Sequence, residues 1–198
     1  MAAIVHAGTL GRWHEELCRL KVSTLRDLVA GSFALKPRSL PSSGGVYCFW
    51  WTGQLTLLRS PECNRHVELA GPAGRPVTLH FDDEWLGLQT ELPIPLYVGK
   101  TADNLHKRVN SHLMLSRGRV TPLFEGHRKQ ERPTTSCQVR AGVEHLFPAL
   151  VDTRDLVLDH LGLSWVLLDG DEHAANRFYL EDLAIGMMRP PLNIDIER

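Results

Sequence analysis

The chain has 198 residues, of which 43% are hydrophobic, and a net charge of −1, values that fit a globular protein with a sizeable core. No run approaches the roughly 18 apolar residues of a membrane span, and the N-terminal segment turns polar before a signal-peptide core develops, so we expect a cytoplasmic protein without a membrane partner. The four cysteines lack a C-x-x-C pair, which argues against a zinc ribbon and against a disulfide framework.

The first half of the chain is predicted to combine helices with aromatic strands. Leu10, Trp13, Leu17 and Leu20 recur at helical spacing. A turn-rich linker then marks a boundary before GVYCFWW, an apolar and aromatic run of strand length. The expected elements are a helix within 9–31, including a short second helix near 23–29, the linker at 36–45, and strands at 45–51, 54–59 and 76–81.

The run IPLYVG reads as a buried strand over residues 94–99, with Gly99 as its terminal kink. The letters GKT that follow do not complete a nucleotide-binding phosphate loop. Such a loop needs a glycine five residues before the Gly-Lys pair, and Ile94 stands there. Beyond it we expect a helix after residue 101, a basic loop without periodicity at 116–140, a strand at 163–168 and a helix at 171–188.

Charge is distributed unevenly along the chain. Residues 99–140 carry nine Lys or Arg and three Asp or Glu, a balance of +6, whereas residues 141–198 have a balance of −7. The basic segment also contains three histidines, and this composition suits contact with a polyanion. A solvated charged face would have the same composition, so composition alone leaves both interpretations open.

The helix after IPLYVG is predicted to begin with Thr101 as its N-cap. Its apolar residues recur every four positions and predict a buried stripe, beside which polar residues form a second row. Arginine suits phosphate oxygens and histidine can move a proton near neutral pH, although a surface row of an amphipathic helix would look the same. The apolar stripe consists of Leu105, Val109 and Leu113, and the polar row of Asn104, Arg108 and His112.

The last helix places a carboxylate, Glu181, at the centre of an apolar arc. Burying an unpaired carboxylate costs several kcal/mol, so Glu181 needs a cation, a hydrogen-bond partner or a proton. A local pair with Arg177 is one solution. The other is a metal-binding carboxylate, and a single Glu suits Mg²⁺, which keeps most of its waters and takes further ligands from substrate phosphates.

In chain order, these segments resemble the GIY-YIG nuclease family over roughly residues 45–195. The ordered set joins two strands, a helix start, an Arg and a His one turn apart, and an acid on a later helix. The resemblance implies an α+β fold with a small central antiparallel sheet flanked by helices. The matching residues are Gly45-Val46-Tyr47, Tyr97-Val98-Gly99, Lys100, Asn104, Arg108, His112, Glu181 and the closing Pro191-Leu192-Asn193.

The chain departs from compact family members in its insertions. Fifty positions separate Tyr47 from Tyr97, where those members have a tight hairpin, so we expect an elaborated hairpin with the two tyrosines still paired. Added elements of this sort resemble those of restriction-type members, where they read DNA. The expected organisation is an N-terminal helical extension, residues 1–44, and a nuclease domain, residues 45–198, with insertions at 52–94 and 116–160.

The resemblance also implies a role for each matching residue. Tyr47 would act as general base or relay for the attacking water, and Tyr97 would order that water and the scissile phosphate. Arg108 would stabilise charge on the phosphoryl oxygens. Glu181 would hold one Mg²⁺ or Mn²⁺ ion, His112 would assist Tyr47, Lys100 would add positive potential, and Asn193 would order the site.

The expected function is a metal-dependent DNA endonuclease that leaves 5′-phosphate and 3′-hydroxyl ends, either sequence-specific and restriction-like or selective for repair substrates or DNA structure. Cutting both strands with one site would need a homodimer or two sequential nicks. The alternatives are a non-catalytic nucleic-acid-binding module and a domain that docks an acidic protein. The expected DNA contacts are Lys100, Asn104, Lys107, Arg117, Arg119, Arg128, Lys129 and Arg132.

Overall fold

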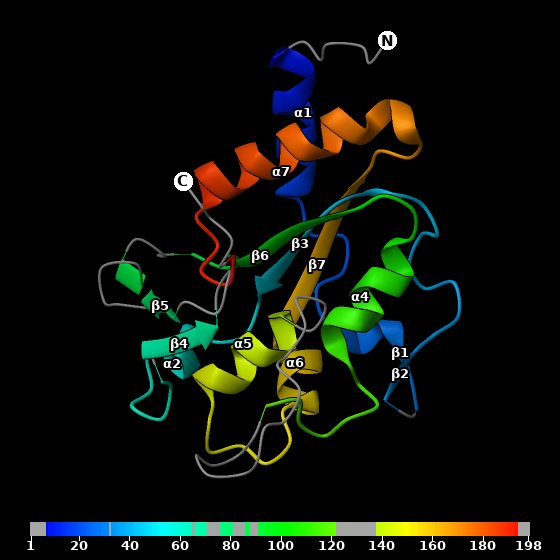
Figure 1. Cartoon of the computed structure of the whole chain (residues 1–198). Helices are drawn as coiled ribbons and strands as arrows, with labels where there is room; N and C mark the ends of the chain where they lie inside the picture. Colours follow the sequence, from blue (N-terminus) through cyan, green and yellow to red (C-terminus); the bar gives the residue numbers. More distant parts are fainter. Residues whose placement is uncertain are drawn as a thin grey trace.

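The computed structural model describes residues 7–31, 33–64, 66–70, 76–80, 86–87, 91–121 and 138–193, with backbone alone for 66–70, 76–80 and 138. It confirms the predicted α+β class, because helices cover both faces of a three-stranded antiparallel sheet (Figure 1). In the described part of the chain, no helix has the length and apolar character needed to cross a membrane.

The central sheet has the strand order β6-β3-β7, with both pairs antiparallel. The middle strand, β3 (Gly45–Trp51), is buried along its whole length, which explains its continuous apolar and aromatic run. The edge strands are β6 (Ile94–Thr101) and β7 (Leu161–Leu167). The sheet therefore joins segments that lie more than a hundred residues apart, and the predicted strands at 45–51, 94–99 and 163–168 are confirmed.

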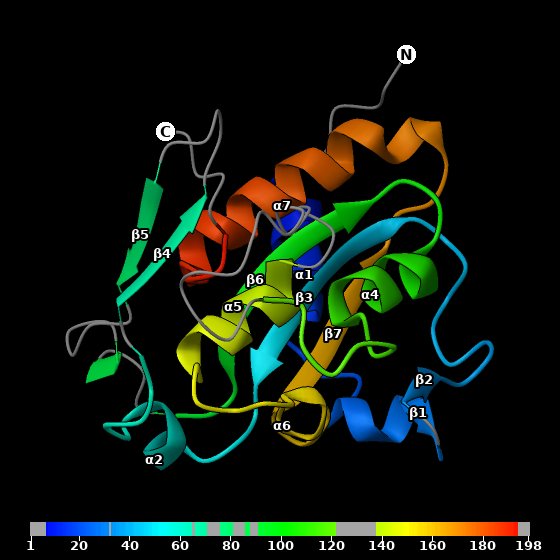
Figure 2. The same ribbon diagram turned by 60° about the horizontal axis from the view of Figure 1, so that its bottom comes forward.

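Alternate side chains of β3 enter two separate cores. Tyr47, Phe49 and Trp51 face one core, whereas Val46, Cys48 and Trp50 face the other. The first core is closed by α4 (Leu105–Leu113), α5 (Gln138–Leu146) and α6 (Arg154–His160), and the second by α1 (Ala7–Leu17) and α7 (Ala174–Met188), as Figure 2 shows. Successive side chains of a strand point to opposite faces of the sheet, so the residues of β3 alternate between the two cores.

The N-terminal segment is built into these cores. Leu17 at the end of α1 is fully buried in the second core, and the hydroxyl of Ser164 on β7 donates to its carbonyl oxygen. Leu25, Leu28 and Leu35 belong to the first core. The segment after α1 contains the 3₁₀ turn η1 (Leu25–Leu28) and the short paired strands β1 (Val29–Ala30) and β2 (Ala34–Leu35).

The connection from β3 to β6 contains one element that was predicted wrongly. Residues 54–59 were expected to form a strand, but Leu55–Leu58 form the helical turn α2. A helical turn places Leu55 and Leu58 on one side, where both pack against the first core. The strand expected at 76–81 is confirmed as β5 (Pro76–His80), which pairs antiparallel with β4 (His66–Ala70).

The helix that carries Arg108 begins later than predicted. β6 continues through Thr101, which pairs with Gly45, so Thr101 is not the N-cap and Gly99 does not end the strand. Asn104 is the cap, because its side-chain oxygen accepts a hydrogen bond from the backbone N–H of Lys107 at 2.8 Å. The last helix is confirmed as α7, preceded by the 3₁₀ turn η4 (Asp171–His173).

Candidate active site

The hydroxyl of Tyr47 lies at the centre of a cluster between β3 and α4. Its oxygen is 2.7 Å from Nε2 of His112, and Nε of Arg108 donates to it at 3.2 Å. The two partners lie four residues apart on α4, so one face of this helix presents both to the tyrosine. The structure therefore brings together three of the residues that the sequence singled out.

The imidazole of His112 is completely buried. Burial, and to a smaller extent the charge of Arg108, lowers the pKa of His112 from 6.5 to about 3, so the ring is neutral near neutral pH. Nδ1 has no hydrogen-bond partner within the described residues. A neutral imidazole can accept the proton of a phenol or donate to a phenolate oxygen, and the contact with Tyr47 can therefore serve both states of the tyrosine.

His112 should make folding stability depend on pH. Its pKa is about 3 in the folded protein, against the ordinary value of 6.5 in an unfolded chain, so its contribution is fully present above pH 6.5 and is lost as pH falls toward 3. The loss should approach about 1.4 kcal/mol per pH unit within that window. Since glutamine does not titrate, His112→Gln should remove this slope, which urea unfolding between pH 7.5 and 4.5 would measure. Equal slopes for the two proteins would contradict the buried neutral histidine.

Gly99 leaves the space in which the two tyrosine rings meet. The two tyrosine strands pair as expected, but the tyrosines are diagonal to each other, because Tyr47 lies opposite Gly99 and Tyr97 opposite Phe49. The two rings lie on one face with their centroids 6.3 Å apart. A Cβ atom on Gly99 would lie 2.5 Å from the hydroxyl oxygen of Tyr47 and 2.8 Å from Cε1 of Tyr97. This close approach requires a glycine. The sequence analysis predicted Gly99 as the kink that ends the strand and did not identify this role.

Tyr97 also contacts the histidine. Its ring centroid is 4.9 Å from that of His112, and its side chain is 7% exposed, whereas Tyr47 is completely buried. Arg108 interacts with both tyrosines, and although burial lowers the pKa of its guanidinium, these contacts raise it overall. Arg108 is therefore a permanent cation between two phenols.

Glu181 projects from α7 on the other side of the sheet and pairs with Lys100 of β6. The ammonium of Lys100 is in hydrogen-bond contact with Oε2 of Glu181, and the two side chains are 40% and 15% exposed. The expected alternative, a local pair with Arg177, is wrong, because Nη1 of Arg177 donates to the carbonyl oxygens of Leu168 and Gly170. The carboxylate thus already has a cation beside it.

The position of Glu181 on α7 also differs from the prediction. The buried face of α7 consists of Asn176, Arg177, Leu180, Ala184 and Ile185, and Glu181 lies off its centre, between Arg177 and Ile185, with its side chain 15% exposed. The helix therefore carries its carboxylate at the boundary between core and solvent. Such a position suits a charged group better than full burial does.

The two halves of the site are electrostatically linked. Burial is the largest effect on Tyr47 and raises the pKa of its phenol well above the ordinary value. Tyr97 and Glu181 raise it further, while Arg108 opposes them. Glu181 has the smallest of these effects on Tyr47; its structural connection to the tyrosines is Lys100, which lies on the same strand, β6, as Tyr97.

Asn193 holds the edge strand that carries Tyr97, Gly99 and Lys100. Its side-chain oxygen accepts from the backbone N–H of Val98 at 2.8 Å, and its amide nitrogen donates to the carbonyl oxygen of Val98 at 2.7 Å. The backbone N–H of Leu192 donates to the carbonyl oxygen of Leu96. The segment after α7 therefore satisfies backbone groups that an edge strand would otherwise leave open.

Searches against known proteins add no relative. No protein-family model matches the chain, and no curated protein matches it. The geometry of the site and the motif resemblance therefore carry the functional argument.

The expected DNA contacts fall into three groups. Lys107 and Arg117 are exposed, whereas Asn104 uses its side chain to cap α4. The side chain of Arg119 is 10% exposed and donates to backbone carbonyl groups, including those of Thr121 and Glu144, which gives it a structural contact instead. Arg128, Lys129 and Arg132 lie outside the described residues.

A buried ion pair on α5 holds the chain at residues 117–121. The sequence analysis did not identify this pair. Arg140 and Glu144 are both completely buried, one turn apart on α5, with Nε of Arg140 donating to the carboxylate at 2.9 Å. The carboxylate also accepts from the backbone N–H groups of Val120 and Thr121 and from the hydroxyl of Thr153. It therefore joins the described residues on both sides of 122–137. An Arg and a Glu four positions apart among apolar residues were the available signal.

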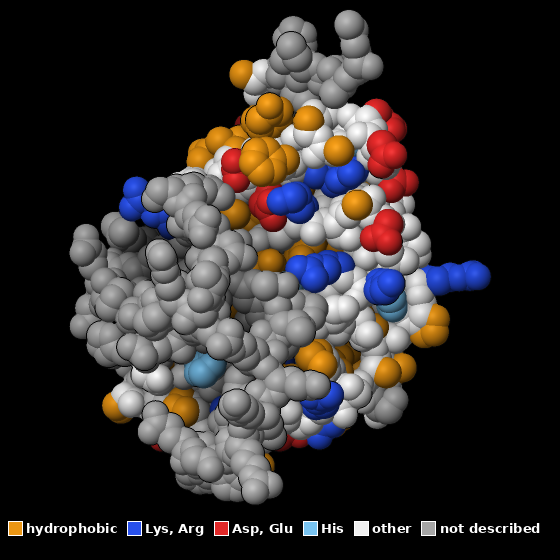
Figure 3. All heavy atoms as spheres, viewed as in Figure 1, with side chains coloured by type: hydrophobic (Ala, Val, Ile, Leu, Met, Phe, Trp, Pro, Cys, Tyr) orange, Lys and Arg blue, Asp and Glu red, His pale blue; other side chains and the backbone are white. Residues whose placement is uncertain are grey.

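Basic side chains gather on the face that carries α7 and α4. Figure 3 shows Lys and Arg side chains across the middle of this face, hydrophobic side chains above them where α7 crosses, and acidic side chains both between these two groups and along the upper right margin. A polyanion approaching the middle of this face would meet positive charge.

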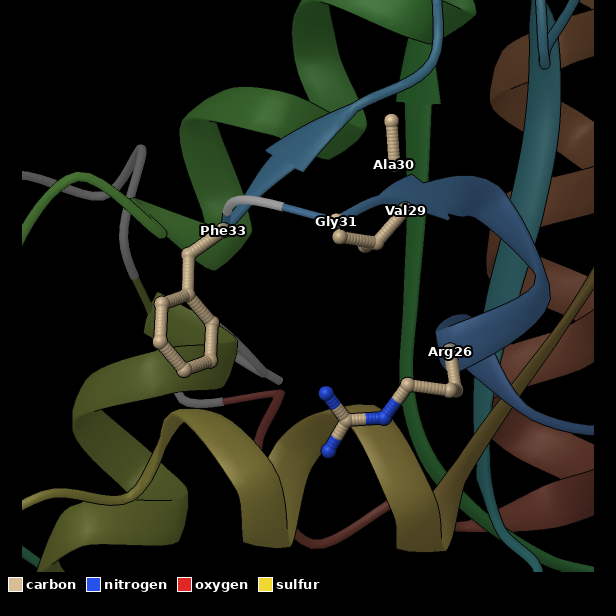
Figure 4. Close-up of a pocket in the computed structure, with 5 residues that line it drawn as sticks. All are labelled: Arg26, Val29, Ala30, Gly31 and Phe33. Atoms are coloured by element: carbon tan, nitrogen blue, oxygen red, sulfur yellow. The ribbon is translucent and has the colours of Figure 1, made fainter.

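A shallow pocket elsewhere does not share residues with this site. It is lined by Arg26, Val29, Ala30, Gly31 and Phe33, near β1 and β2 (Figure 4). The guanidinium of Arg26 donates to Asp159 at 2.7 Å and to Asp155 at 2.6 Å, so its charge is already compensated. We assign this pocket no part in the chemistry.

Glu181 is the residue expected to hold a metal ion, and its carboxylate is paired with Lys100. Within the described residues no group of three or more His, Cys, Asp or Glu could hold a metal ion. A metal ion at Glu181 would have to displace the ammonium of Lys100, with which the carboxylate is paired. This donor set suits Mg²⁺ or Mn²⁺, which complete their coordination with water and phosphate oxygens.

Lys100 should compete with a metal ion for Glu181. Lys100→Met keeps the length of the side chain and removes its charge, so Mn²⁺ should bind the DNA-free variant more tightly. The expected gain is about 2- to 5-fold, because partly exposed ion pairs contribute at most about 1 kcal/mol. Electron paramagnetic resonance of free Mn²⁺ during titration measures it, with Lys107→Met as the matched control. Weaker binding by Lys100→Met would show that the lysine holds the carboxylate in place instead of competing.

Proposed function

We propose that the protein is a metal-dependent DNA endonuclease that hydrolyses phosphodiester bonds to 5′-phosphate and 3′-hydroxyl ends. One observation carries the proposal: the hydroxyl of Tyr47 is hydrogen-bonded to both His112 and Arg108, which lie one turn apart on α4. In-line attack on a phosphodiester needs a proton acceptor, a positive clamp and neutralisation of the leaving oxygen. Tyr47 would be the proton acceptor and Arg108 the positive clamp. Glu181 would supply the carboxylate that holds a metal ion at the leaving oxygen.

The proton path can be followed through the residues of the chain. In this scheme Tyr47 reacts as the phenolate, which takes the proton of the attacking water, while neutral His112 donates Nε2–H to the phenolate oxygen across the 2.7 Å contact. Arg108 keeps its Nε–H on the tyrosine oxygen, which stabilises negative charge there, and its remaining N–H groups can clamp a phosphate. Tyr97 borders the same space and orders the water and the phosphate.

Glu181 and Lys100 complete the site from the α7 side. Glu181 would hold the divalent ion, which would supply positive charge at the phosphate and the leaving 3′ oxygen. Lys100, once displaced from Glu181, is free to pair with a phosphate oxygen. Asn193 bonds the backbone of Val98 and so holds the strand between Tyr97 and Lys100 in place.

A non-catalytic nucleic-acid-binding module on the same fold is the second candidate. One observation favours it: Tyr47 is completely buried, and burial raises the pKa of the phenol, which makes it a weak base in the free protein. The module would keep the positive face and perform no hydrolysis. The two candidates differ in whether DNA is cut.

Incubation with supercoiled plasmid and Mg²⁺, beside an EDTA control, separates these candidates. An endonuclease converts the plasmid to nicked or linear forms in Mg²⁺ and leaves it intact in EDTA. End-labelling with and without phosphatase then identifies 5′-phosphate ends, and sequencing of ends from random-sequence DNA separates defined sites from scattered nicks. DNA that is bound but never cut, with Mg²⁺ or Mn²⁺, would favour the binding module.

A further inference from the structure

Phe178 is an exposed aromatic residue at the rim of the candidate site. It lies one turn before Glu181 on α7 and is 49% exposed. The ammonium of Lys100 is 5.3 Å from the centre of its ring, and the ring of Tyr179, 55% exposed, packs edge-on against it at 5.9 Å. The ring is therefore held in place by two neighbours while much of its surface stays open.

A single exposed phenylalanine is ordinary on a protein surface, so exposure alone says little. Phe178 differs because it shares Lys100 with Glu181: one ammonium contacts the carboxylate and also lies over the ring. One helical turn spans about 5.4 Å, so the ring lies within one nucleotide of a phosphate that is bound near Glu181. A flat apolar surface beside a phosphate site is the combination that binds unpaired nucleotides, in which positive groups follow the backbone and aromatic rings stack on bases.

We propose that the ring of Phe178 stacks on an unpaired nucleobase next to the scissile phosphate. This inference rests on the proposed nuclease function and names its substrate class. Base faces in a duplex are covered by their neighbours, so a base can stack on Phe178 only where it is unpaired or extruded. The substrate is therefore DNA with an unpaired base beside the cleaved bond, such as single-stranded or mismatched DNA.

Two oligonucleotides of equal charge test the contact without any cleavage. One is fluorescently labelled oligothymidylate of about 20 nucleotides, and the other has the same number of phosphates on an abasic backbone, with affinities measured by anisotropy in EDTA. Phe178→Ala should weaken oligothymidylate binding about 5- to 150-fold, the range for losing one aromatic stacking partner. Binding of the abasic strand should stay within about 2-fold, because phosphate contacts are unchanged.

Two further variants control this measurement. Phe178→Trp keeps an aromatic face and should retain most of the affinity for oligothymidylate. Met187→Ala removes another exposed apolar side chain of α7, 64% exposed, and should leave both affinities unchanged. Circular dichroism establishes that each variant is folded before its affinity is compared.

The outcomes separate the inference from the function on which it rests. If the wild-type protein cuts plasmid and Phe178→Ala binds both strands like wild type, the stacking inference is overturned and the nuclease stands. An equal loss for both strands also overturns it, because the ring would then support phosphate binding. If the wild-type protein prefers oligothymidylate through Phe178 but never cuts DNA, the stacking contact stands and the nuclease fails. Absence of DNA binding by the wild-type protein overturns both.

Discussion

Glu181→Gln is expected to abolish cleavage, with a loss in single-turnover rate of at least about 10³-fold, while DNA binding stays intact or becomes tighter. The substitution keeps the shape of the side chain and removes the charge that would hold a divalent ion. It also releases Lys100, whose ammonium contacts this carboxylate, for contact with phosphate. Quench-flow cleavage at saturating protein measures the rate, and anisotropy in EDTA measures the binding.

Glu172→Gln is the matched control for this experiment. It makes the same chemical change at an exposed position just before α7, and it should cut at the wild-type rate. The inactive Glu181→Gln protein, purified in the same way, also excludes a contaminating nuclease. A Glu181→Gln protein that cuts as fast as wild type at matched Mg²⁺ would show that the ion is held elsewhere.

Local patterns were sufficient to predict the strands and helices that carry the site. GVYCFWW and IPLYVG form β3 and β6 because continuous apolar runs suit strands covered on both faces. The fourfold spacing of Leu105, Val109 and Leu113 predicted the buried face of α4, and all three are completely buried. The short apolar run at 55–58 could not be assigned in this way, because a few apolar residues fit a strand and a helical turn equally well.

Long-range geometry could not be predicted from these patterns. The register between β3 and β6 places Tyr47 opposite Gly99 and Phe49 opposite Tyr97, which sets the two tyrosines diagonally. The pair of Lys100 and Glu181 joins residues that are 81 positions apart and lie on a strand and a helix. Neither contact has a local signal, because each depends on how whole elements pack.

Helical periodicity also gave a misleading position for Glu181. Phe178 falls in the apolar arc that predicts a buried Glu181, but it is 49% exposed, whereas Arg177 is 5% exposed and pairs with backbone carbonyl groups. Hydrophobicity alone therefore rotated the predicted buried face of α7 away from the observed one. An exposed aromatic and a buried arginine on one helix are departures from patterning that functional or structural demands can produce.

Arg108→Ala is expected to lower the single-turnover cleavage rate by at least about 10²-fold, the usual scale for losing one preorganised charge donor. In the structure its Nε donates to the hydroxyl of Tyr47 at 3.2 Å, and its charge opposes the rise in the pKa of that phenol caused by burial. Removing it should therefore weaken both the phosphate clamp and the proton acceptor. Lys107→Ala is the control, because this neighbouring cation is exposed and should affect DNA affinity without changing the saturating rate.

The conservative variant separates the two roles of this arginine. Arg108→Lys keeps a positive charge, but an ammonium cannot reproduce the planar fork that contacts the phenol and a phosphate together. It should therefore recover DNA binding more fully than it recovers the rate. A change confined to KM in Arg108→Ala would mean that Arg108 only positions the strand. Tyr47 would then have to lose its proton although burial raises its pKa, without help from the charge of Arg108.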